Sequence, residues 1–265
     1  MKRLLFAFVF IFYSISASAK FQSIDIPCAV KECNPEWGPT ITRLYKGDGN
    51  KKKPAIMWYS GGASTFTNPE YSPISELIGK FDIIMVASPI PVISDRSTNG
   101  LSPNAYDERA VYRMKQVTDH YIKSLNKPIW LGGISSGGVR MIAVLSGKDR
   151  QADKYAGLIF ATTYVSRLQN GTPQYNIPVY DIKYEMNLPI LVLQHERDHK
   201  PAQQPYLQKW FRDDLAKKNL GKTELILTTE GDPMITTHDG GHHWFLFNKD
   251  EVARVVSKFI TENTR

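Results

Sequence analysis

The sequence predicts an α/β protein with a doubly wound, mostly parallel sheet that carries helices on both faces. Two observations lead to this prediction. Short, continuously apolar runs recur along the chain, as in strands that are buried on both faces. Longer segments with helical periodicity separate these runs, an alternation typical of parallel strands joined by right-handed crossovers.

The expected elements follow an irregular stretch, residues 20–53, in which residues 40–45 could form an early edge strand. Buried strands are predicted at residues 55–59, 81–87, 129–131, 155–163, 189–193 and 224–228. Helices are predicted at residues 73–80, 104–125, 139–145, 205–218 and 250–261. Residues 164–187 have no clear period, and we interpret them as a small cap over the site.

Two of the predicted helices have a distinct apolar face, which is expected to pack on the sheet. The apolar positions of the first are Ala110, Met114, Val117, Tyr121 and Ile122, and those of the second are Val252, Val255, Val256, Phe259 and Ile260.

A serine lies at a predicted strand-to-helix turn, within the pattern G-x-S-x-G at residues 133–137. This is the pattern of a nucleophile elbow, in which glycines permit a tight turn and the serine Oγ projects from it. The N-terminus of the next helix directs free N–H groups toward a reacting carbonyl. Ser135 is therefore the candidate nucleophile, and the alternative is a glycine-rich turn that only packs.

A serine nucleophile needs a general base, and the base needs a carboxylate that orients it. On a parallel sheet such groups gather just after the strands, and two segments offer them. The strand at residues 189–193 is followed by Asp198, with Glu196 as an alternative acid. The loop after residues 224–228 ends in the adjacent histidines His242 and His243.

These three segments together resemble the α/β-hydrolase superfamily, over nearly all of residues 20–265. Residues 133–137 resemble its elbow, and residues 188–198 resemble the strand and loop that deliver its acid. Residues 240–244 resemble its histidine loop, close to the G-G-H-x-W form of dienelactone-hydrolase-like and polyester-depolymerase-like members. The order serine, acid, histidine is also that of the superfamily. The resemblance implies a serine hydrolase that acts by acyl transfer and requires no cofactor.

The resemblance also assigns roles to the residues. Asp198 fits the spacing from strand to acid better than Glu196. His242 directly follows the glycine pair, as the histidine of the family usually does, whereas the spacing from the closing helix favours His243. We prefer His242 as the base and keep His243 as the alternative. His195 and His199 flank the acid, but no H-x-x-x-H pair accompanies them and no metal site is expected.

The oxyanion-binding segment departs from the family. A clear H-G-G-G motif is missing, and Ser60, Gly61, Gly62 and Ala63 stand in its place. We expect the oxyanion to be held by the backbone N–H of Ser136 and by that of Gly62 or Ala63.

The N-terminus has the make-up of a secretory signal. Two basic residues precede about a dozen mostly apolar ones, and an A-x-A cleavage pattern ends at Ala19. We expect residues 1–19 to be removed on export, to the periplasm or the medium, leaving residues 20–265 as a single domain. The alternative is an uncleaved anchor, although the apolar run is short for a membrane span.

The two cysteines, Cys28 and Cys33, are closely spaced in a chain expected to be exported, which favours a disulfide between them. Thiol titration of the unfolded, unreduced protein would test this pairing. No further Cys or His lies near enough to complete a metal site.

The charge does not indicate a nucleic-acid partner. The net charge of +7 is scattered, and the densest run, at residues 51–53, is interpreted as a solvated loop. The sequence thus predicts an exported serine hydrolase for a small-molecule carboxylic ester. The alternatives are a peptidase or amidase with the same triad and a catalytically silent binding protein on the same fold. Oligomeric state and substrate are open.

Overall fold

The computed structural model describes a set of segments: residues 21–27, 40–61, 72–87, 108–135, 137–138, 141, 152–162, 167–169, 172–174, 185–195, 215–228 and 248–264. Their strands are β1 (Phe21–Ile26), β2 (Thr40–Tyr45), β3 (Ala55–Tyr59), β4 (Asp82–Val86), β5 (Ile129–Ile134), β6 (Gly157–Ala161), β7 (Arg167–Gln169), β8 (Thr172–Gln174), β9 (Ile190–His195) and β10 (Thr223–Thr228). Their helices are α1 (Glu108–Leu125), α4 (Ala216–Lys218) and α6 (Lys249–Asn263), with 3-10 turns η3 (Ser75–Leu77) and η6 (Ala152–Lys154).

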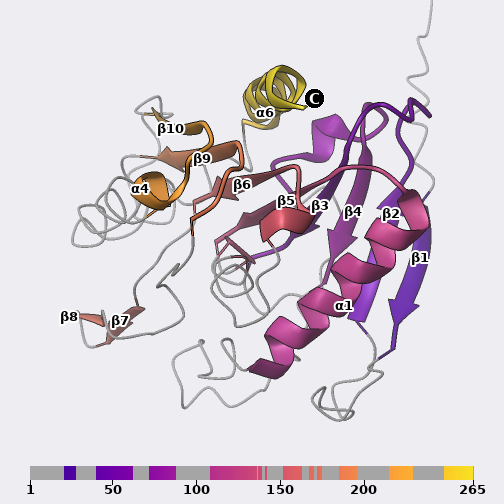
Figure 1. Ribbon diagram of the computed structural model, residues 1–265, viewed down its shortest axis with the longest axis horizontal. Helices are drawn as coiled ribbons and strands as arrows, with labels where there is room; N and C mark the ends of the chain where they lie inside the picture. The colour runs from indigo at the N-terminus through magenta and orange to yellow at the C-terminus, as the bar shows by residue number, and fades with distance from the viewer. Residues whose placement is uncertain are drawn as a thin grey trace, which may run out of the picture.

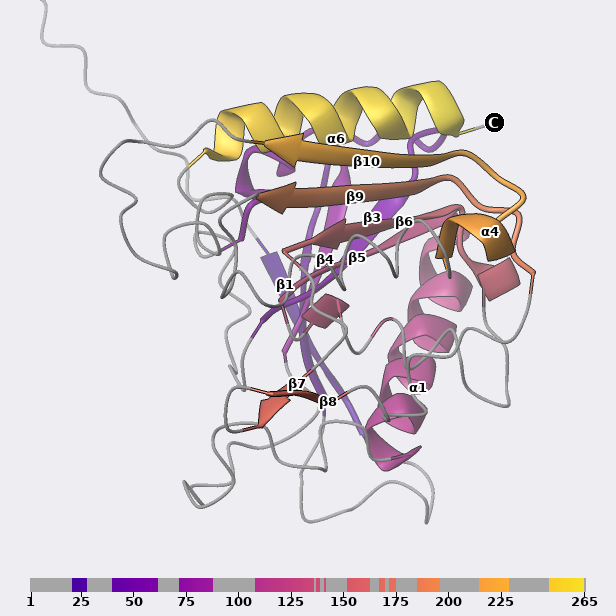
Figure 2. The ribbon, with the colours of Figure 1, turned by 90° about the vertical axis from the view of Figure 1, so that its left-hand side faces the viewer.

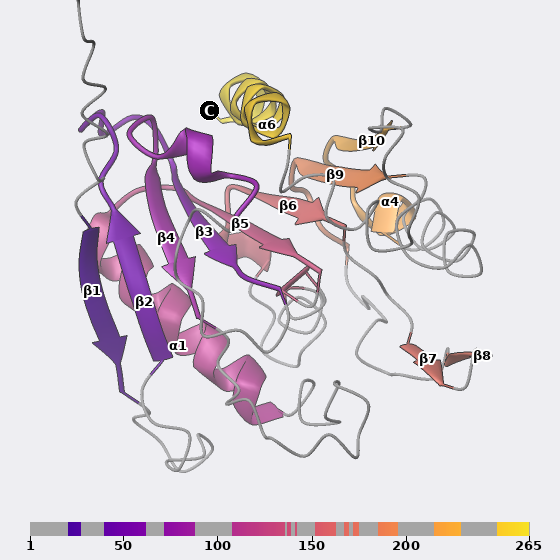
Figure 3. The same ribbon diagram turned by 180° about the vertical axis from the view of Figure 1, so that it is seen from behind.

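Eight of the strands form one sheet in the order β1-β2-β4-β3-β5-β6-β9-β10 (Figure 1). The six strands from β4 to β10 in this order are parallel, and β2 pairs antiparallel with both β1 and β4. The predicted doubly wound, mostly parallel sheet is therefore confirmed. The short hairpin of β7 and β8 stands away from the main sheet (Figure 3).

Helices cover both faces of this sheet. Figure 2 shows α6 along one face and α1 along the other. Alternate residues of β3 pack on opposite faces of the sheet. Met57 and Tyr59 belong to the core cluster with α1. Ile56 and Trp58 belong to the cluster with α6. Every residue of β3, β4, β5, β6 and β9 is buried, as the continuously apolar runs predict.

The two amphipathic faces pack as expected where the side chains are described. Met114, Val117 and Tyr121 of α1 are buried, and Ile122 packs against the same cluster. On α6 the predicted apolar positions Val252, Val256, Phe259 and Ile260 are buried, together with Ala253, and Val255 is partly buried beside them. In the described part of the chain, no helix has the length and apolarity needed to cross a membrane.

Two predicted elements are corrected, and one segment without predicted elements contains strands. The stretch interpreted as irregular contains β1, so β2 is not an edge strand. Phe21–Ile26 has mostly exposed side chains and therefore shows no apolar run; it is held by backbone pairing with β2, from Phe21 opposite Tyr45 to Ile26 opposite Thr40. The predicted helix at residues 73–80 is only the turn η3, because Gly79 takes a φ of 85° and the chain turns into β4. Within residues 164–187, described parts form β7 and β8.

Two tryptophans in the sheet pack against glycines of the neighbouring strand. A Cβ on Gly132 would lie 2.4 Å from the Trp58 ring, and one on Gly157 would lie 2.4 Å from the Trp130 ring. The Trp130 ring also meets Phe259 of α6 edge-to-face, with centroids 5.8 Å apart, and its Nε1 donates to Thr264 Oγ1 at 3.2 Å. These glycines give the large rings room inside a sheet that is covered on both faces.

Hydrogen bonds between buried hydroxyl groups connect α1 to β2 and to Tyr155. Thr118 Oγ1 donates to Met114 O and lies 2.8 Å from the Tyr155 hydroxyl oxygen. Between β2 and α1, Thr42 Oγ1 lies 2.6 Å from the Tyr121 hydroxyl oxygen. Burial raises the pKa of Tyr155 and of Tyr121 above the ordinary tyrosine value, so both phenols remain protonated donors.

A buried ion pair connects β4 and β5 at the amino ends of the parallel strands. Lys127 Nζ, just before β5, lies 2.6 Å from Asp82 Oδ2 at the start of β4, and the N–H of Gly47 donates to Asp82 Oδ1 at 2.8 Å. Side-chain exposure is 11% for Lys127 and 7% for Asp82. Burial alone raises the pKa of Asp82, but the hydrogen bonds from Lys127 and Gly47 and the nearby lysine charges together hold this pKa below its ordinary value.

We expect Asp82→Asn to lower the free energy of unfolding by about 3 kcal/mol at pH 7, because Lys127 is left buried without a counter-ion. A depressed folded-state pKa contributes stability above the unfolded-state value, about 3.9. That stability is lost as the pH falls through the folded-state pKa. Urea unfolding of both proteins should therefore show a difference that shrinks below about pH 4.

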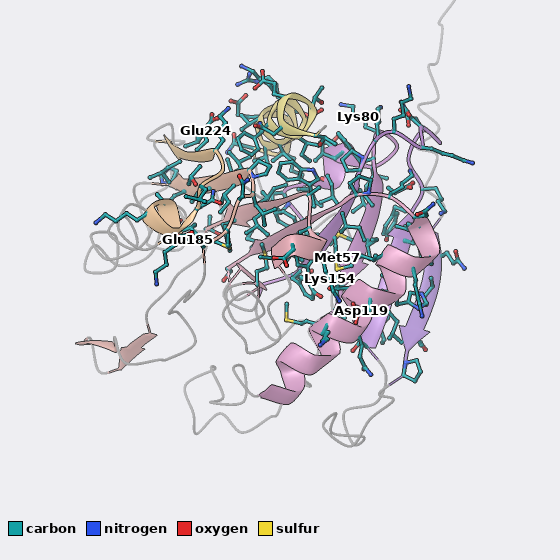
Figure 4. All side chains as sticks on the ribbon, in the orientation of Figure 1. Met57, Lys80, Asp119, Lys154, Glu185 and Glu224 are labelled. Atoms are coloured by element: carbon teal, nitrogen blue, oxygen red, sulfur yellow. The ribbon has the colours of Figure 1, made fainter. Side chains whose placement is uncertain are left out.

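Asp119→Asn is the matched control, since Asp119 pairs with Lys154 on the surface (Figure 4), with side chains 46% and 40% exposed. It should cost less than about 1 kcal/mol. Equal losses for the two variants would contradict the role assigned to the buried pair.

Candidate active site

The candidate nucleophile lies at the carboxyl edge of the parallel strands, opposite the Asp82–Lys127 pair. Ser135 directly follows β5, and its N–H donates to Ala161 O at the end of β6 at 3.0 Å. Thr162 directly follows β6, and its N–H donates to Leu193 O of β9 at 2.9 Å. These two hydrogen bonds continue the backbone pairing one residue beyond β5 and β6. They therefore hold the carboxyl ends of β5, β6 and β9 side by side.

Ser135 has a strained backbone. Its φ is 55°, in the left-handed region that residues with a Cβ seldom adopt. A nucleophile elbow requires a left-handed φ at its serine, because the serine side chain has to project from a sharp strand-to-helix turn. The positive φ of Ser135 is thus the backbone conformation that a nucleophile elbow would require.

The glycines of the motif are required by close backbone contacts. A Cβ on Gly137 would lie 2.2 Å from Tyr59 O, and one on Gly133 would lie 2.7 Å from the carbonyl carbon of Gly137. Neither contact can be relieved by a side-chain rotation, because backbone atoms are involved. The start of the helix, at Gly137 and Gly138, consequently packs directly against the end of β3.

Gly61 brings the segment after β3 beside the serine. A Cβ on Gly61 would lie 3.0 Å from Ser135 Cβ and 3.6 Å from Ser135 Oγ. The Ser60–Ala63 segment, considered from the sequence as the oxyanion segment, therefore begins next to the nucleophile. A side chain at position 61 would crowd the Ser135 hydroxyl.

Solved structures with the same architecture share this arrangement of strands. Dienelactone hydrolase from Anabaena variabilis is 12% identical, with 92% of this chain and 99% of that chain covered and a TM-score of 0.57. Est1E from Butyrivibrio proteoclasticus is 14% identical, with 90% and 99% covered and a TM-score of 0.57. Oligopeptidase B from Leishmania major is 13% identical with a TM-score of 0.61, and this chain covers only 37% of its length. By sequence, no family model and no curated protein matches.

The chain has the α/β-hydrolase fold. The deciding observations are the strand order, with β2 antiparallel in an otherwise parallel run, and the likeness of the whole chain to members of that fold. At 12–14% identity these likenesses concern the architecture and not the chemistry.

The α/β-hydrolase fold brings two further polar residues to this edge, Thr162 and His195, and both are fully buried. His195 is the last residue of β9 rather than part of the loop that follows, because the strand runs two residues beyond the predicted end. Thr162 has a φ of 43°. Neither was singled out as a site residue from sequence, and only the polar character of Thr162 and Thr163 directly after the apolar run could have drawn attention to that position.

The other predicted site residues lie outside the described residues. They are Ser136, Gly62, Ala63, Asp198, Glu196, His242 and His243, and the same holds for Cys28 and Cys33. Their roles and the disulfide stay predictions. Among the segments that are described, no three His, Cys, Asp or Glu side chains gather as a metal site would need.

The strain at Ser135 can be measured through substitution. Glycine adopts a φ of 55° without steric cost, whereas alanine retains the Cβ. We expect Ser135→Gly to be more stable than Ser135→Ala by about 0.5 to 1 kcal/mol, the relief of strain being partly offset by the greater backbone entropy of glycine.

Thermal and urea unfolding of the two variants would test this difference. The matched control is Thr162→Gly against Thr162→Ala, where the same sign is expected because Thr162 also has a left-handed φ. A Ser135→Gly protein that is less stable than Ser135→Ala would show that the turn is not strained.

Proposed function

We propose that this chain is an exported serine hydrolase that cleaves a small-molecule carboxylic ester through an acyl-enzyme on Ser135. The observation that carries the proposal is the elbow itself. A strained serine stands at the carboxyl edge, with Gly61 beside its Oγ and glycines at the close approaches behind it. The signal-like residues 1–19 motivate export, and a Cys28–Cys33 disulfide would form after it.

The proposed reaction has two steps. A histidine, His242 by preference, takes the Ser135 proton as Oγ bonds to the ester carbonyl carbon, and Asp198 orients the imidazole. Backbone N–H groups of Ser136 and of Gly62 or Ala63 stabilise the oxyanion. The imidazolium then gives its proton to the departing alcohol, and a water molecule repeats the sequence to release the carboxylic acid.

The neighbours in fold favour two classes of substrate, with esters first. Several of the similar structures are described as esterases and one as a dienelactone hydrolase, which favours an ester over other acyl compounds. The similar oligopeptidase B favours a second candidate, a peptidase or amidase with the same triad. Parallel assays of matched ester and amide substrates would separate the two, because only the leaving group differs.

The test of the proposal is the dependence of turnover on Ser135. Ser135→Ala should lower kcat for an activated ester by at least about four orders of magnitude, since nucleophile and base act as one unit. A fluorophosphonate probe should label the wild-type protein at Ser135 and leave the Ser135→Ala protein unlabelled.

Asp82→Asn serves as the folding control, because it weakens the fold at the opposite edge and should still react with the probe. A wild-type protein that neither turns over esters nor reacts with the probe would identify a catalytically silent protein. Turnover that persists in Ser135→Ala would assign the reaction to another residue.

The proposed roles of the histidine base and the aspartate acid can be tested separately from that of Ser135. If His242 is the base, His242→Ala should lower kcat by several orders of magnitude, whereas His243→Ala should cost a much smaller factor. Asp198→Asn should keep the fold and lower kcat steeply, because the imidazole loses the partner that fixes its tautomer. The wild-type rate should rise with pH through one ionisation near neutrality, as the histidine becomes neutral.

Steady-state kinetics on the purified variants, with circular dichroism as the check on folding, would decide between the histidines. A dead His243→Ala with an active His242→Ala would transfer the role to His243 and leave the serine hydrolase in place. Activity in both variants would exclude the triad. Glu196→Gln is the matched control for the acid and should retain most of the rate.

A further inference from the structure

The strand β1 forms one edge of the eight-stranded sheet. It pairs with β2 on one side, and none of the described strands lies beyond it (Figure 3). The pairing runs without a bulge from Phe21 opposite Tyr45 to Ile26 opposite Thr40. Most of its side chains are exposed, and Phe21 retains 48% of its accessible surface. A regular, exposed edge strand that contains neither proline nor lysine is able to pair with a further strand.

The backbone of β1 presents three residues to this free edge. In an antiparallel pair, successive residues direct their N–H and C=O groups alternately toward the partner strand and away from it. Ile24 O accepts a hydrogen bond from Thr42 Oγ1 of β2 at 2.9 Å, so the groups of Ile24 point toward β2. Those of Phe21, Ser23 and Asp25 therefore point outward, and within the described part of the chain no hydrogen bond occupies them.

Arg43 of β2 adds a positive charge beside the same edge. It lies opposite Ser23, and its guanidinium carbon is 4.7 Å from the centre of the Phe21 ring. Its Nε is buried without a hydrogen-bond partner, and no carboxylate among the described residues pairs with the guanidinium. The side chain leans toward Phe21 and so away from Asp25, which lies on the other side of Ser23 in β1. A partly buried guanidinium of this kind lacks an acceptor.

We propose that two copies of this chain associate through β1. The two strands pair antiparallel about a twofold axis and continue the sheet from one copy into the other. All three outward residues find a partner when Ser23 lies opposite the partner's Ser23 and Phe21 lies opposite the partner's Asp25. In this register each opposed pair exchanges two backbone hydrogen bonds, whereas a shift along the strand leaves an outward residue unpaired.

The same register is complementary in charge. Asp25 comes to lie beside the partner's Phe21, over whose ring the partner's Arg43 guanidinium is placed. Its carboxylate thus supplies the acceptor that Arg43 lacks, and the twofold axis forms this contact twice. A second copy is therefore a better occupant than an unrelated peptide, because it brings a carboxylate and a guanidinium to matching positions. The association is independent of the proposed reaction, since β2, β4 and β3 separate β1 from β5.

Ser23→Pro tests the backbone pairing, with Ser23→Ala as the matched control. Proline removes the outward N–H and leaves the hydrogen bonds between β1 and β2 in place, and edge strands tolerate a proline so oriented. Sedimentation of the wild-type protein should show a dimer in equilibrium with the monomer. Ser23→Pro should raise the Kd of this dimer at least about 10-fold, because two hydrogen bonds at the twofold axis are lost. Ser23→Ala keeps both and should leave the Kd nearly unchanged.

Charge reversal tests the contact between Asp25 and the partner's Arg43. Asp25→Arg and Arg43→Asp each bring like charges together across the twofold axis, and each should raise the Kd at least about 10-fold. The double variant restores opposite charges and should return the Kd toward the wild-type value. Glu224→Arg is the matched control, because Glu224 lies on β10 at the opposite edge of the sheet. It should leave the Kd unchanged.

A wild-type protein that stays monomeric at the highest concentration at which it is soluble overturns the proposal and leaves the edge to a strand of another protein. A dimer whose Kd is the same in Ser23→Pro as in the wild type also overturns it, because its interface then lies elsewhere. So does a double variant that associates no better than the single ones. Circular dichroism checks the fold of each variant, and if the proline variant does not fold, the charge-reversal variants decide in its place.

Discussion

The site depends on one close approach, between the turn after β5 and the end of β3. Gly137 sits so near the Tyr59 carbonyl oxygen that a Cβ would overlap it, and Gly61 approaches Ser135 from the same side. Two backbones can meet at this distance only where side chains are missing. The left-handed φ of Ser135 follows from this geometry, because the chain must reverse from strand to helix within a few residues.

A sheet buried on both faces makes this approach rigid. The core clusters with α1 and α6 enclose β3 and β5, and Trp58 and Trp130 fill the space above glycines of the adjacent strands. Close packing of this kind leaves strand ends little freedom to relax. Strain at Ser135 and Thr162 can persist because the surrounding core over-determines their positions.

Stability and chemistry are placed at opposite edges of the parallel strands. The amino edge carries the Asp82–Lys127 pair, with the Gly47 N–H satisfying the remaining carboxylate oxygen. The carboxyl edge carries left-handed residues and the buried polar side chains Thr162 and His195. A fold whose polar groups are well satisfied at one edge can tolerate the strained backbone of Ser135 and Thr162 at the other.

The sequence by itself determined the buried strands, the two amphipathic helices and the tight turn at Ser135. Each of these depends on local spacing: continuous apolar runs, a helical period and glycines around Ser135. It did not reveal β1, which has no continuous apolar run, contributes only Ile24 and Ile26 to the core, and pairs through its backbone with β2. The positions of Gly61 beside Ser135, and of Thr162 between β5 and β9, were decided only by tertiary structure. Their importance arises from the order β3-β5-β6-β9, and contacts between strands that are distant in sequence leave no local pattern.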